Sequence, residues 1–327
     1  MANIVILGSG GFGLSLAVLC HNRGHNVCVW SKFKDEIDTI KRTGELKAKL
    51  PGVMIPEEIE LTTDISCAKG KDIVVVGIPS AFVRSVCLEA AEFIDKKAVI
   101  VSTAKGIEDG SLKRMSEVVS ECIPNNTVVA LTGPSHAEEI ARGIPTLIVA
   151  ACEDLSTAVY VQKELSSETL RIYTSEDVIG CEIGGALKNI IALAAGICDG
   201  MGYGDNTKAA LMTRGLSEIR RLGIAMGGKS ETFSGLTGIG DLIVTCTSMH
   251  SRNRRAGILI GEGVAVSDAI RRVGTVEGYY CAKTAYELSK KLGVEMPITQ
   301  QLYNVLENGK DAFTSLKELM LRPRVSE

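Results

Sequence analysis

Short apolar runs alternate with amphipathic stretches through the first half of the chain. The runs are rich in β-branched residues, which predicts strands, and one of them, residues 73–76, contains no polar position. Strands without alternation are typical of a parallel sheet that is covered on both faces. We therefore expect a doubly wound α/β sheet. Its predicted strands are residues 3–7, 26–30, 72–78, 98–103, 127–132 and 146–151, with 171–174 as a candidate further strand.

The pattern changes near residue 178. Beyond it, long segments rich in Ala, Gly, Leu and Ile follow helical spacing, and the stretch 227–240 is the clearest long loop between helices. A length of 327 residues suits two domains. We expect an α/β domain over residues 1–178 and a helix-rich domain over residues 179–327.

Composition excludes several classes of protein. Hydrophobic residues make up 45% of the chain and charged residues 23%, which is ordinary globular usage. A net charge of -3 argues against sequence-independent binding to nucleic acid, which needs a basic face. The ten cysteines form no CxxC pair and no zinc-binding pattern, so we expect reduced thiols and no metal site.

The chain also gives a prediction of location. It begins without a basic leader or a small-residue cleavage site, which favours the cytoplasm. Its most apolar later segment, residues 183–198, is shorter than the roughly 20 residues of a membrane span and contains Lys188. We expect no insertion into a membrane.

A glycine-rich sequence follows the first predicted strand directly and leads into a helical stretch over residues 14–23. In this setting Gly8 would make a tight turn, Gly10 would let a pyrophosphate approach the backbone, and Gly13 would let the helix pack on the strand. A plain glycine-rich turn is the alternative, but the position at the first strand-to-helix junction favours a dinucleotide site. The residues concerned are Gly8, Ser9, Gly10, Gly11, Phe12 and Gly13.

The end of the second predicted strand bears on the choice of cofactor. An NAD-specific enzyme usually presents an Asp or Glu there to the adenosine ribose, whereas this chain has no acid in residues 27–32. Ser31, Lys32 and Lys34 would accept or attract a 2'-phosphate. We therefore expect NADP(H) or NAD(H) as cofactor, with NADPH favoured, although lysines after a strand are often simply solvated.

Lys188 is the first candidate for catalysis. It is the only charged residue between Glu182 and Asp199, and its neighbours are apolar or small. Desolvation disfavours the ammonium form, which suits a group that exchanges protons with a substrate. The alternative is a lysine that extends from a buried helix to water. Asn189 beside it could bind substrate or a backbone group.

Two further candidates follow predicted strands. Lys105 and the segment Gly133-Pro134-Ser135-His136-Ala137 both come after a strand, at the edge where α/β sheets bind ligands. His136 belongs to no catalytic constellation, so we expect a structural role for it.

An acid and a basic run stand close together in the second half of the chain. Asp241 enters an apolar run, so we expect it to pair with a cation or a substrate hydroxyl. Ser251-Arg252-Asn253-Arg254-Arg255 follows ten residues later and offers phosphate ligands, because arginine can bind phosphate through two hydrogen bonds. In isolation such a run is more often a solvated helix face.

These motifs together resemble the bacterial NAD(P)-dependent glycerol-3-phosphate dehydrogenase family, almost from end to end. Besides the glycine loop and Lys105 in its Thr-Ala-Lys-Gly setting, the resemblance lies in these segments: residues 133–137, 186–189, 238–242, 251–254, 276–279 and 295–298. It implies a Rossmann N-terminal domain, an all-helical C-terminal domain and substrate held between the two. It also implies a homodimer that interconverts sn-glycerol 3-phosphate and dihydroxyacetone phosphate and supplies glycerol 3-phosphate for phospholipid synthesis.

The resemblance also implies roles for individual residues. Lys188 is similar to the family's proton acceptor, and Lys105 and Asp241 complete the predicted catalytic set. The implied substrate-binding residues are Lys105, Gly133, Ser135, Lys188, Asn189, Asp241, Ser251, Arg252 and Asn253. The implied cofactor contacts, besides residues 8–13, are Ser31, Lys32, Lys105, Ala137, Arg252, Val276 and Glu277.

Two alternatives to this function stay open at the level of the sequence. A dehydrogenase of the β-hydroxyacid or ketopantoate type shares the nucleotide-binding fold and also uses a lysine, but its substrate carries a carboxylate. A nucleotide-sensing module without turnover is the other alternative. It leaves the placement of Lys188 and Asp241 unexplained.

Overall fold

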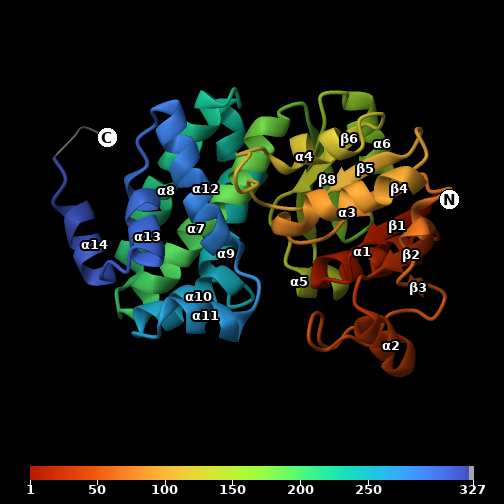
Figure 1. Cartoon of the computed structure of the whole chain (residues 1–327), viewed down its shortest axis with the longest axis horizontal. Coiled ribbons are helices and arrows are strands. Elements are labelled where there is room, and N and C mark those ends of the chain that lie inside the picture. Colours follow the sequence, from red (N-terminus) through yellow and green to blue (C-terminus); the bar gives the residue numbers. More distant parts are fainter. Residues whose placement is uncertain (324–327) are drawn as a thin grey trace. The chain divides into compact units, whose positions relative to one another are not determined.

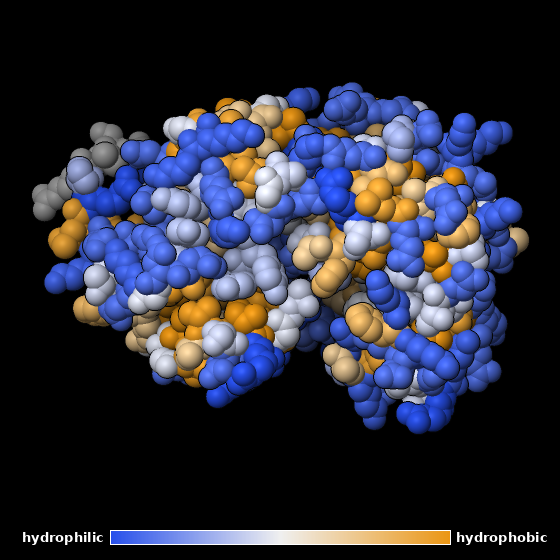
Figure 2. Space-filling view, viewed as in Figure 1, coloured by the Kyte–Doolittle hydropathy of each residue, from blue (hydrophilic) through white to orange (hydrophobic). Residues whose placement is uncertain are grey.

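The computed structural model describes residues 1–323 and separates into two compact units (Figure 1). The first unit contains residues 1–105 and 113–181, and the second contains residues 106–112 and the chain from residue 182 onward. Hydrophilic residues cover much of the visible surface of each unit, with smaller hydrophobic patches between them (Figure 2).

One eight-stranded sheet forms the centre of the first unit, in the order β3-β2-β1-β4-β5-β6-β7-β8. Neighbouring strands run parallel, except that β7 is antiparallel to β6. The prediction of a doubly wound sheet is confirmed, with this one reversal. The strands are β1 (Asn3–Leu7), β2 (Asn26–Trp30), β3 (Glu60–Thr62), β4 (Ile73–Val76), β5 (Val99–Ser102), β6 (Val128–Thr132), β7 (Thr146–Ala151) and β8 (Leu170–Ser175).

The continuous apolar runs are explained by packing on both faces of the sheet. Along β1, Ile4 and Ile6 belong to one buried cluster, while Val5 and Leu7 belong to the cluster on the opposite face. Each such side chain contributes roughly 1.5–3 kcal/mol when fully buried. The first cluster includes α1 (Gly11–Asn22) and α6 (Leu155–Leu165), and the second includes α3 (Val83–Ala90) and α4 (Met115–Cys122).

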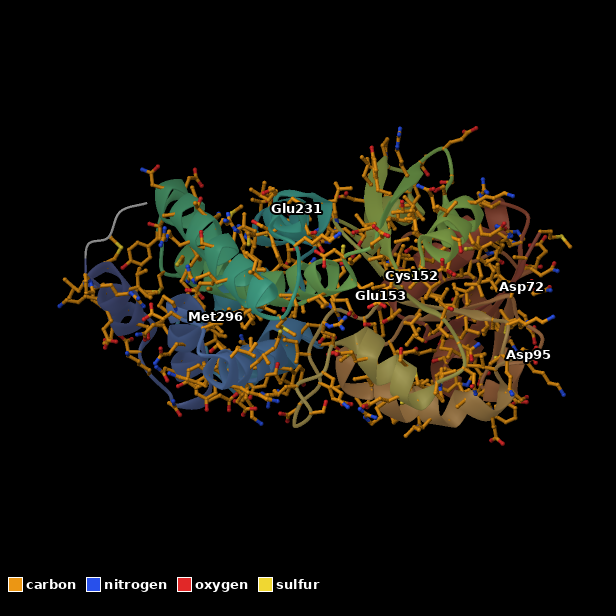
Figure 3. The ribbon with its side chains drawn as sticks, turned by 90° about the horizontal axis from the view of Figure 1, so that it is seen from above. Asp72, Asp95, Cys152, Glu153, Glu231 and Met296 are labelled. Atoms are coloured by element: carbon orange, nitrogen blue, oxygen red, sulfur yellow. The ribbon has the colours of Figure 1, made fainter. Side chains whose placement is uncertain are left out.

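The edge at which β4 and β5 begin carries acids with structural roles. Asp72, just before β4, accepts a hydrogen bond from the backbone N–H of Asn3 at 2.7 Å, and Asp95, before β5, accepts one from Gly70 at 2.9 Å (Figure 3). These bonds tie loops to the sheet. Lys105, which is predicted to bind ligands, follows the other end of β5.

The second unit is helical, with no strand among its described residues. The stretch predicted as a long loop is not irregular, because it folds into short helical turns at Ser230–Ser234 and Leu236–Gly240. The buried ring of Phe233 anchors these turns, and Gly238 permits them, since a Cβ there would lie 2.1 Å from the Phe233 carbonyl oxygen. The helices are α7 (Val178–Gly200), α8 (Asp205–Ala225), α9 (Asp241–Thr247), α10 (Arg252–Gly261), α11 (Val266–Val273), α12 (Glu277–Leu292), α13 (Pro297–Glu307) and α14 (Ala312–Met320).

Helix α7 is longer than the apolar segment seen in the sequence. Its 23 residues are sufficient in length and hydropathy to cross a membrane, but 83% of the apolar window is buried inside the protein, as in the core helix of a globular unit. Glycines line its contact with α10. A Cβ on Gly196 would lie 2.1 Å from the Arg254 carbonyl oxygen, and one on Gly257 would lie 2.2 Å from that of Leu193. The two helices therefore pack backbone against backbone.

Candidate functional site

The glycine loop between β1 and α1 has the geometry of a phosphate cradle. Gly8 has φ +123°, and a Cβ on it would lie 2.6 Å from the Gly77 carbonyl oxygen. A Cβ on Gly13 would lie 2.5 Å from the Gly8 carbonyl oxygen, so the fold itself requires both glycines. At Gly10, by contrast, a Cβ would meet only the Gly77 oxygen at 3.7 Å. This space ahead of the first turn of α1 fits a dinucleotide pyrophosphate.

Polar side chains gather beside this loop at the end of β2. Ser9 Oγ and Ser31 Oγ lie 2.7 Å apart, and both serines are buried. Glu36, in the first turn of α2 (Lys34–Thr43), accepts hydrogen bonds from both hydroxyls, with 3.3 Å to Ser31 Oγ. Lys49 Nζ lies 3.7 Å from the Glu36 carboxylate, whereas Lys32 is exposed. No acid stands at the end of β2 itself, and Glu36 was not predicted because the next helix supplies it.

Lys105 and the segment after β6 form a second cluster in the first unit. Lys105 Nζ donates to the Gly133 carbonyl oxygen at 2.8 Å and to Ser135 Oγ at 3.3 Å. Gly133 has φ +127°, and a Cβ there would lie 3.1 Å from the Ile148 Cα, so a glycine is required. His136 is the N-cap residue of α5 (Ala137–Ala141). The structure thus brings together residues that follow two neighbouring strands.

Ala137 belongs to the environment of the glycine loop. A Cβ placed on Gly11 would lie 3.4 Å from the Ala137 Cβ and 2.6 Å from the Lys49 carbonyl oxygen. Phe12 is partly buried and packs against the cluster on that face of the sheet. These contacts close one side of the loop and leave its Gly10 side open.

Lys188 lies on α7 in the second unit, and its side chain contacts two residues of α9. Its Nζ donates to the Asp241 carboxylate and, at 2.8 Å, to Thr245 Oγ1. Thr245 Oγ1 in turn donates to the Asp241 carbonyl oxygen at 2.6 Å. Lys188 is 6% exposed and Asp241 is fully buried. Thr245 was missed in the sequence, where its spacing of i+4 from Asp241 on one helix face was the available signal.

The contact with Asp241 bears on the charge of Lys188. A buried lysine alone favours the neutral amine, but a carboxylate in direct contact stabilises the ammonium. The expected pairing of Asp241 with a cation is confirmed. Lys188 is held as the cation of an ion pair, and Thr245 fixes the direction of its N–H groups.

The two asparagines that were predicted to bind substrate hold helices around Lys188. Asn253 Nδ2 donates to Asn189 Oδ1 at 2.9 Å, and the Gly278 backbone N–H donates to Asn253 Oδ1 at 2.8 Å. These bonds join α7, α10 and α12. Gly278 is required at this crossing, because a Cβ would lie 2.3 Å from the Asn189 carbonyl oxygen.

The arginine run has distinct environments at successive positions. Ser251 is the N-cap of α10 and accepts a hydrogen bond from the Arg254 backbone N–H at 3.2 Å. Arg254 is paired with Asp199 at 2.8 Å, whereas Arg252 is exposed in the first turn. A guanidinium beside a helix N-terminus fits a phosphate group.

The remaining cofactor candidates of this unit lie at the N-terminus of another helix. Val276, which is buried, is the N-cap residue of α12, and Glu277 is the first residue of that helix. No group of three or more His, Cys, Asp or Glu side chains within residues 1–323 could hold a metal ion.

Comparison with known proteins decides the family. Models described as the N-terminus and the C-terminus of NAD-dependent glycerol-3-phosphate dehydrogenase match residues 3–158 and 177–317. A glycerol-3-phosphate dehydrogenase [NAD(P)+] of Fusobacterium nucleatum is 49% identical over 100% of this chain and 99% of its own length. The chain belongs to the NAD-dependent glycerol-3-phosphate dehydrogenase family. The family predicted from the motifs is therefore confirmed, and with it dependence on NAD or NADP.

Solved structures agree with membership of the glycerol-3-phosphate dehydrogenase family. The crystal structure of the glycerol-3-phosphate dehydrogenase of Coxiella burnetii is 35% identical, has a TM-score of 0.94, and covers 98% of this chain and 99% of its own. A ketopantoate reductase from Ralstonia eutropha covers 96% of this chain and 99% of its own with a TM-score of 0.63, but it is only 15% identical. The likeness to the ketopantoate type is thus one of fold alone.

Proposed function

We propose that this NAD(P)-dependent oxidoreductase interconverts sn-glycerol 3-phosphate and dihydroxyacetone phosphate, with Lys188 as the group that exchanges the proton. The observation that supports this role is the buried ammonium held by Asp241 and Thr245 on α9. An acid or base whose direction is fixed by neighbouring groups is what proton transfer to a reacting oxygen needs. The name of the bacterial relatives supplies the substrate.

The Lys188–Asp241 pair accounts for the proton in the proposed step. A dinucleotide held at the glycine loop, Gly8 to Gly13, would supply or accept the hydride at C2 of the substrate. In reduction, the Lys188 ammonium gives a proton to the oxygen on C2 as that oxygen gains charge, and Asp241 remains as carboxylate. The neutral amine then regains a proton from water, which the adjacent carboxylate favours. In oxidation, neutral Lys188 accepts the hydroxyl proton.

The substrate phosphate needs its own ligands. We assign this role to exposed Arg252, to Ser251 and to the N-terminus of α10. In the first unit, Lys105 is held by Gly133 and Ser135 and offers a second positive charge for an anionic substrate. Fixing a small substrate through its phosphate can lower the barrier by several kcal/mol, because positioning removes an entropic cost.

The decisive experiment is the Lys188→Ala variant. We expect turnover with dihydroxyacetone phosphate to fall at least about a hundredfold while cofactor binding is retained, the usual scale for an acid–base group. Oxidation of NADH and of NADPH is followed by absorbance with dihydroxyacetone phosphate and, in separate assays, with ketopantoate as the alternative substrate. The matched control is Lys290→Ala, an exposed lysine of α12. Near-normal turnover of Lys188→Ala would remove Lys188 from the role.

Location and assembly complete the proposal. We propose that the enzyme works in the cytoplasm as a homodimer and supplies glycerol 3-phosphate for phospholipid synthesis. The ten cysteines are all free thiols, which suits a reducing compartment. Light scattering on the purified protein measures the assembly, and a monomer at working concentration would contradict the dimer.

A further inference from the structure

We propose that Glu36 makes the adenosine end of the cofactor site selective for NAD(H) over NADP(H). The inference rests on the dinucleotide use that belongs to the proposed function, and it concerns one residue that no sequence motif singled out. It also replaces the preference for NADPH that the end of β2 suggested when the sequence was considered alone.

The position of the Glu36 carboxylate is the first observation. In a Rossmann domain, the adenosine ribose lies between the glycine loop and the end of the second strand. Here Ser9 belongs to that loop and Ser31 follows that strand, and their hydroxyls lie 2.7 Å apart. Glu36 accepts hydrogen bonds from both. The first turn of α2 therefore places an acid in the position that, in NAD-specific enzymes, is occupied by an acid from the end of the second strand.

The chemistry of the two cofactors differs at this place. The ribose of NAD presents two neighbouring hydroxyls, which can donate hydrogen bonds to a carboxylate. NADP carries a phosphate on the 2' oxygen, which has no hydrogen to donate and brings negative charge. Ser9 and Ser31 are buried, so water screens a charge placed beside them only weakly. Contact between like charges then costs affinity.

Nearby lysines could attract the 2'-phosphate and so oppose its repulsion by Glu36. Their positions indicate how strong this attraction is. Lys49 is the lysine in contact with the Glu36 carboxylate, at 3.7 Å, so part of its charge is already used. Lys32 and Lys34 are exposed to solvent, where salt screens them. The Glu36 carboxylate, which is fixed and half-buried, would therefore repel a 2'-phosphate more strongly than the exposed lysines would attract it.

The test uses ligands without nicotinamide, so that it does not depend on turnover. Calorimetry gives the Kd of adenosine 5'-monophosphate and of adenosine 2',5'-bisphosphate for the wild-type protein and for Glu36→Gln. We expect the wild type to favour the monophosphate by at least about tenfold and Glu36→Gln to lose most of that ratio. Asp35→Asn is the matched control, because it removes the same charge from an exposed neighbour, and its ratio should stay that of the wild type.

A second variant, with the opposite expected effect on discrimination, keeps the inference testable if Glu36→Gln misfolds. Lys49→Ala leaves the carboxylate without its cation, so discrimination against the bisphosphate should increase. The Kd values of NADH and NADPH, measured by nicotinamide fluorescence, distinguish failure of this inference from failure of the proposed function. Binding of both dinucleotides with a ratio that neither Glu36→Gln nor Lys49→Ala changes would overturn the role of Glu36 alone. Failure of the wild type to bind either dinucleotide would overturn the proposed function and this inference with it.

Discussion

The glycine loop of the first unit and the Lys188–Asp241 pair of the second are built in opposite ways. The loop is made of backbone from one short segment, and its shape follows from where a Cβ does not fit. The pair joins side chains that stand 53 positions apart, and neither would be stable alone in that interior. The comparison teaches that binding of a phosphate can be encoded locally, whereas a buried charge for proton transfer needs a complete set of neighbours.

The largest expected effect comes from breaking the buried pair. Asp241→Leu should lower the free energy of unfolding by about 3–5 kcal/mol, because Lys188 would keep a buried charge without its carboxylate. The double variant Lys188→Met/Asp241→Leu should regain much of this loss, since it removes both charges. Urea unfolding followed by circular dichroism measures both. Equal stability of Asp241→Leu and wild type would show that the pair is not desolvated.

The second prediction separates two functions within the glycine loop. Gly13→Ala should lower the free energy of unfolding by about 1–3 kcal/mol, because its Cβ would lie 2.5 Å from the Gly8 carbonyl oxygen. Gly10→Ala should unfold like the wild type, since its Cβ has room, yet bind NADH at least about tenfold more weakly because the methyl group occupies the space for pyrophosphate. Thermal unfolding and nicotinamide fluorescence distinguish the two. Unchanged affinity of Gly10→Ala would place the pyrophosphate elsewhere.

The smallest effect concerns a buried acid that is bonded mainly to backbone N–H groups. Glu218 accepts hydrogen bonds from Ile298 and Thr299 at the start of α13, and burial raises its pKa above 4.5. A carboxyl group with a raised pKa binds protons more strongly in the folded state, so stability should fall as pH rises from about 4.5 through the raised value. Urea unfolding across this window should show a flatter dependence for Glu218→Gln. An identical slope in the variant would assign the dependence to other groups.

The sequence predicted the sheet well because its signals are local. Strands β1, β2 and β7 begin and end where the apolar runs do, and the glycine loop stands at the predicted junction. Strand β3 was not predicted, because it is a three-residue edge strand whose residues are only partly buried or exposed. The reversal of β7 also left no trace in the pattern, since a strand buried on both faces reads the same in either direction.

The site was predicted as a set of residues but not as a set of contacts. Lys188 and Asp241 were both identified, but not as partners of each other, because they come from different helices. Thr245 and Glu36 were missed for the same reason. Each is an ordinary helical residue in the sequence, and only the path of the chain brings it beside Lys188 or Ser31.

The glycine contact between α7 and α10 limits how this unit can change over evolution. Gly196 and Gly200 on one helix, and Gly257 and Gly261 on the other, leave no gap that a larger residue could use. One helix therefore cannot slide or rotate by a residue without collision, and a single inserted residue in either would misalign the whole contact. The lysine on α7 and the arginine at the start of α10 are thereby kept at a constant separation. Divergence in substrate should consequently occur through side chains, while the spacing between these two helices stays unchanged.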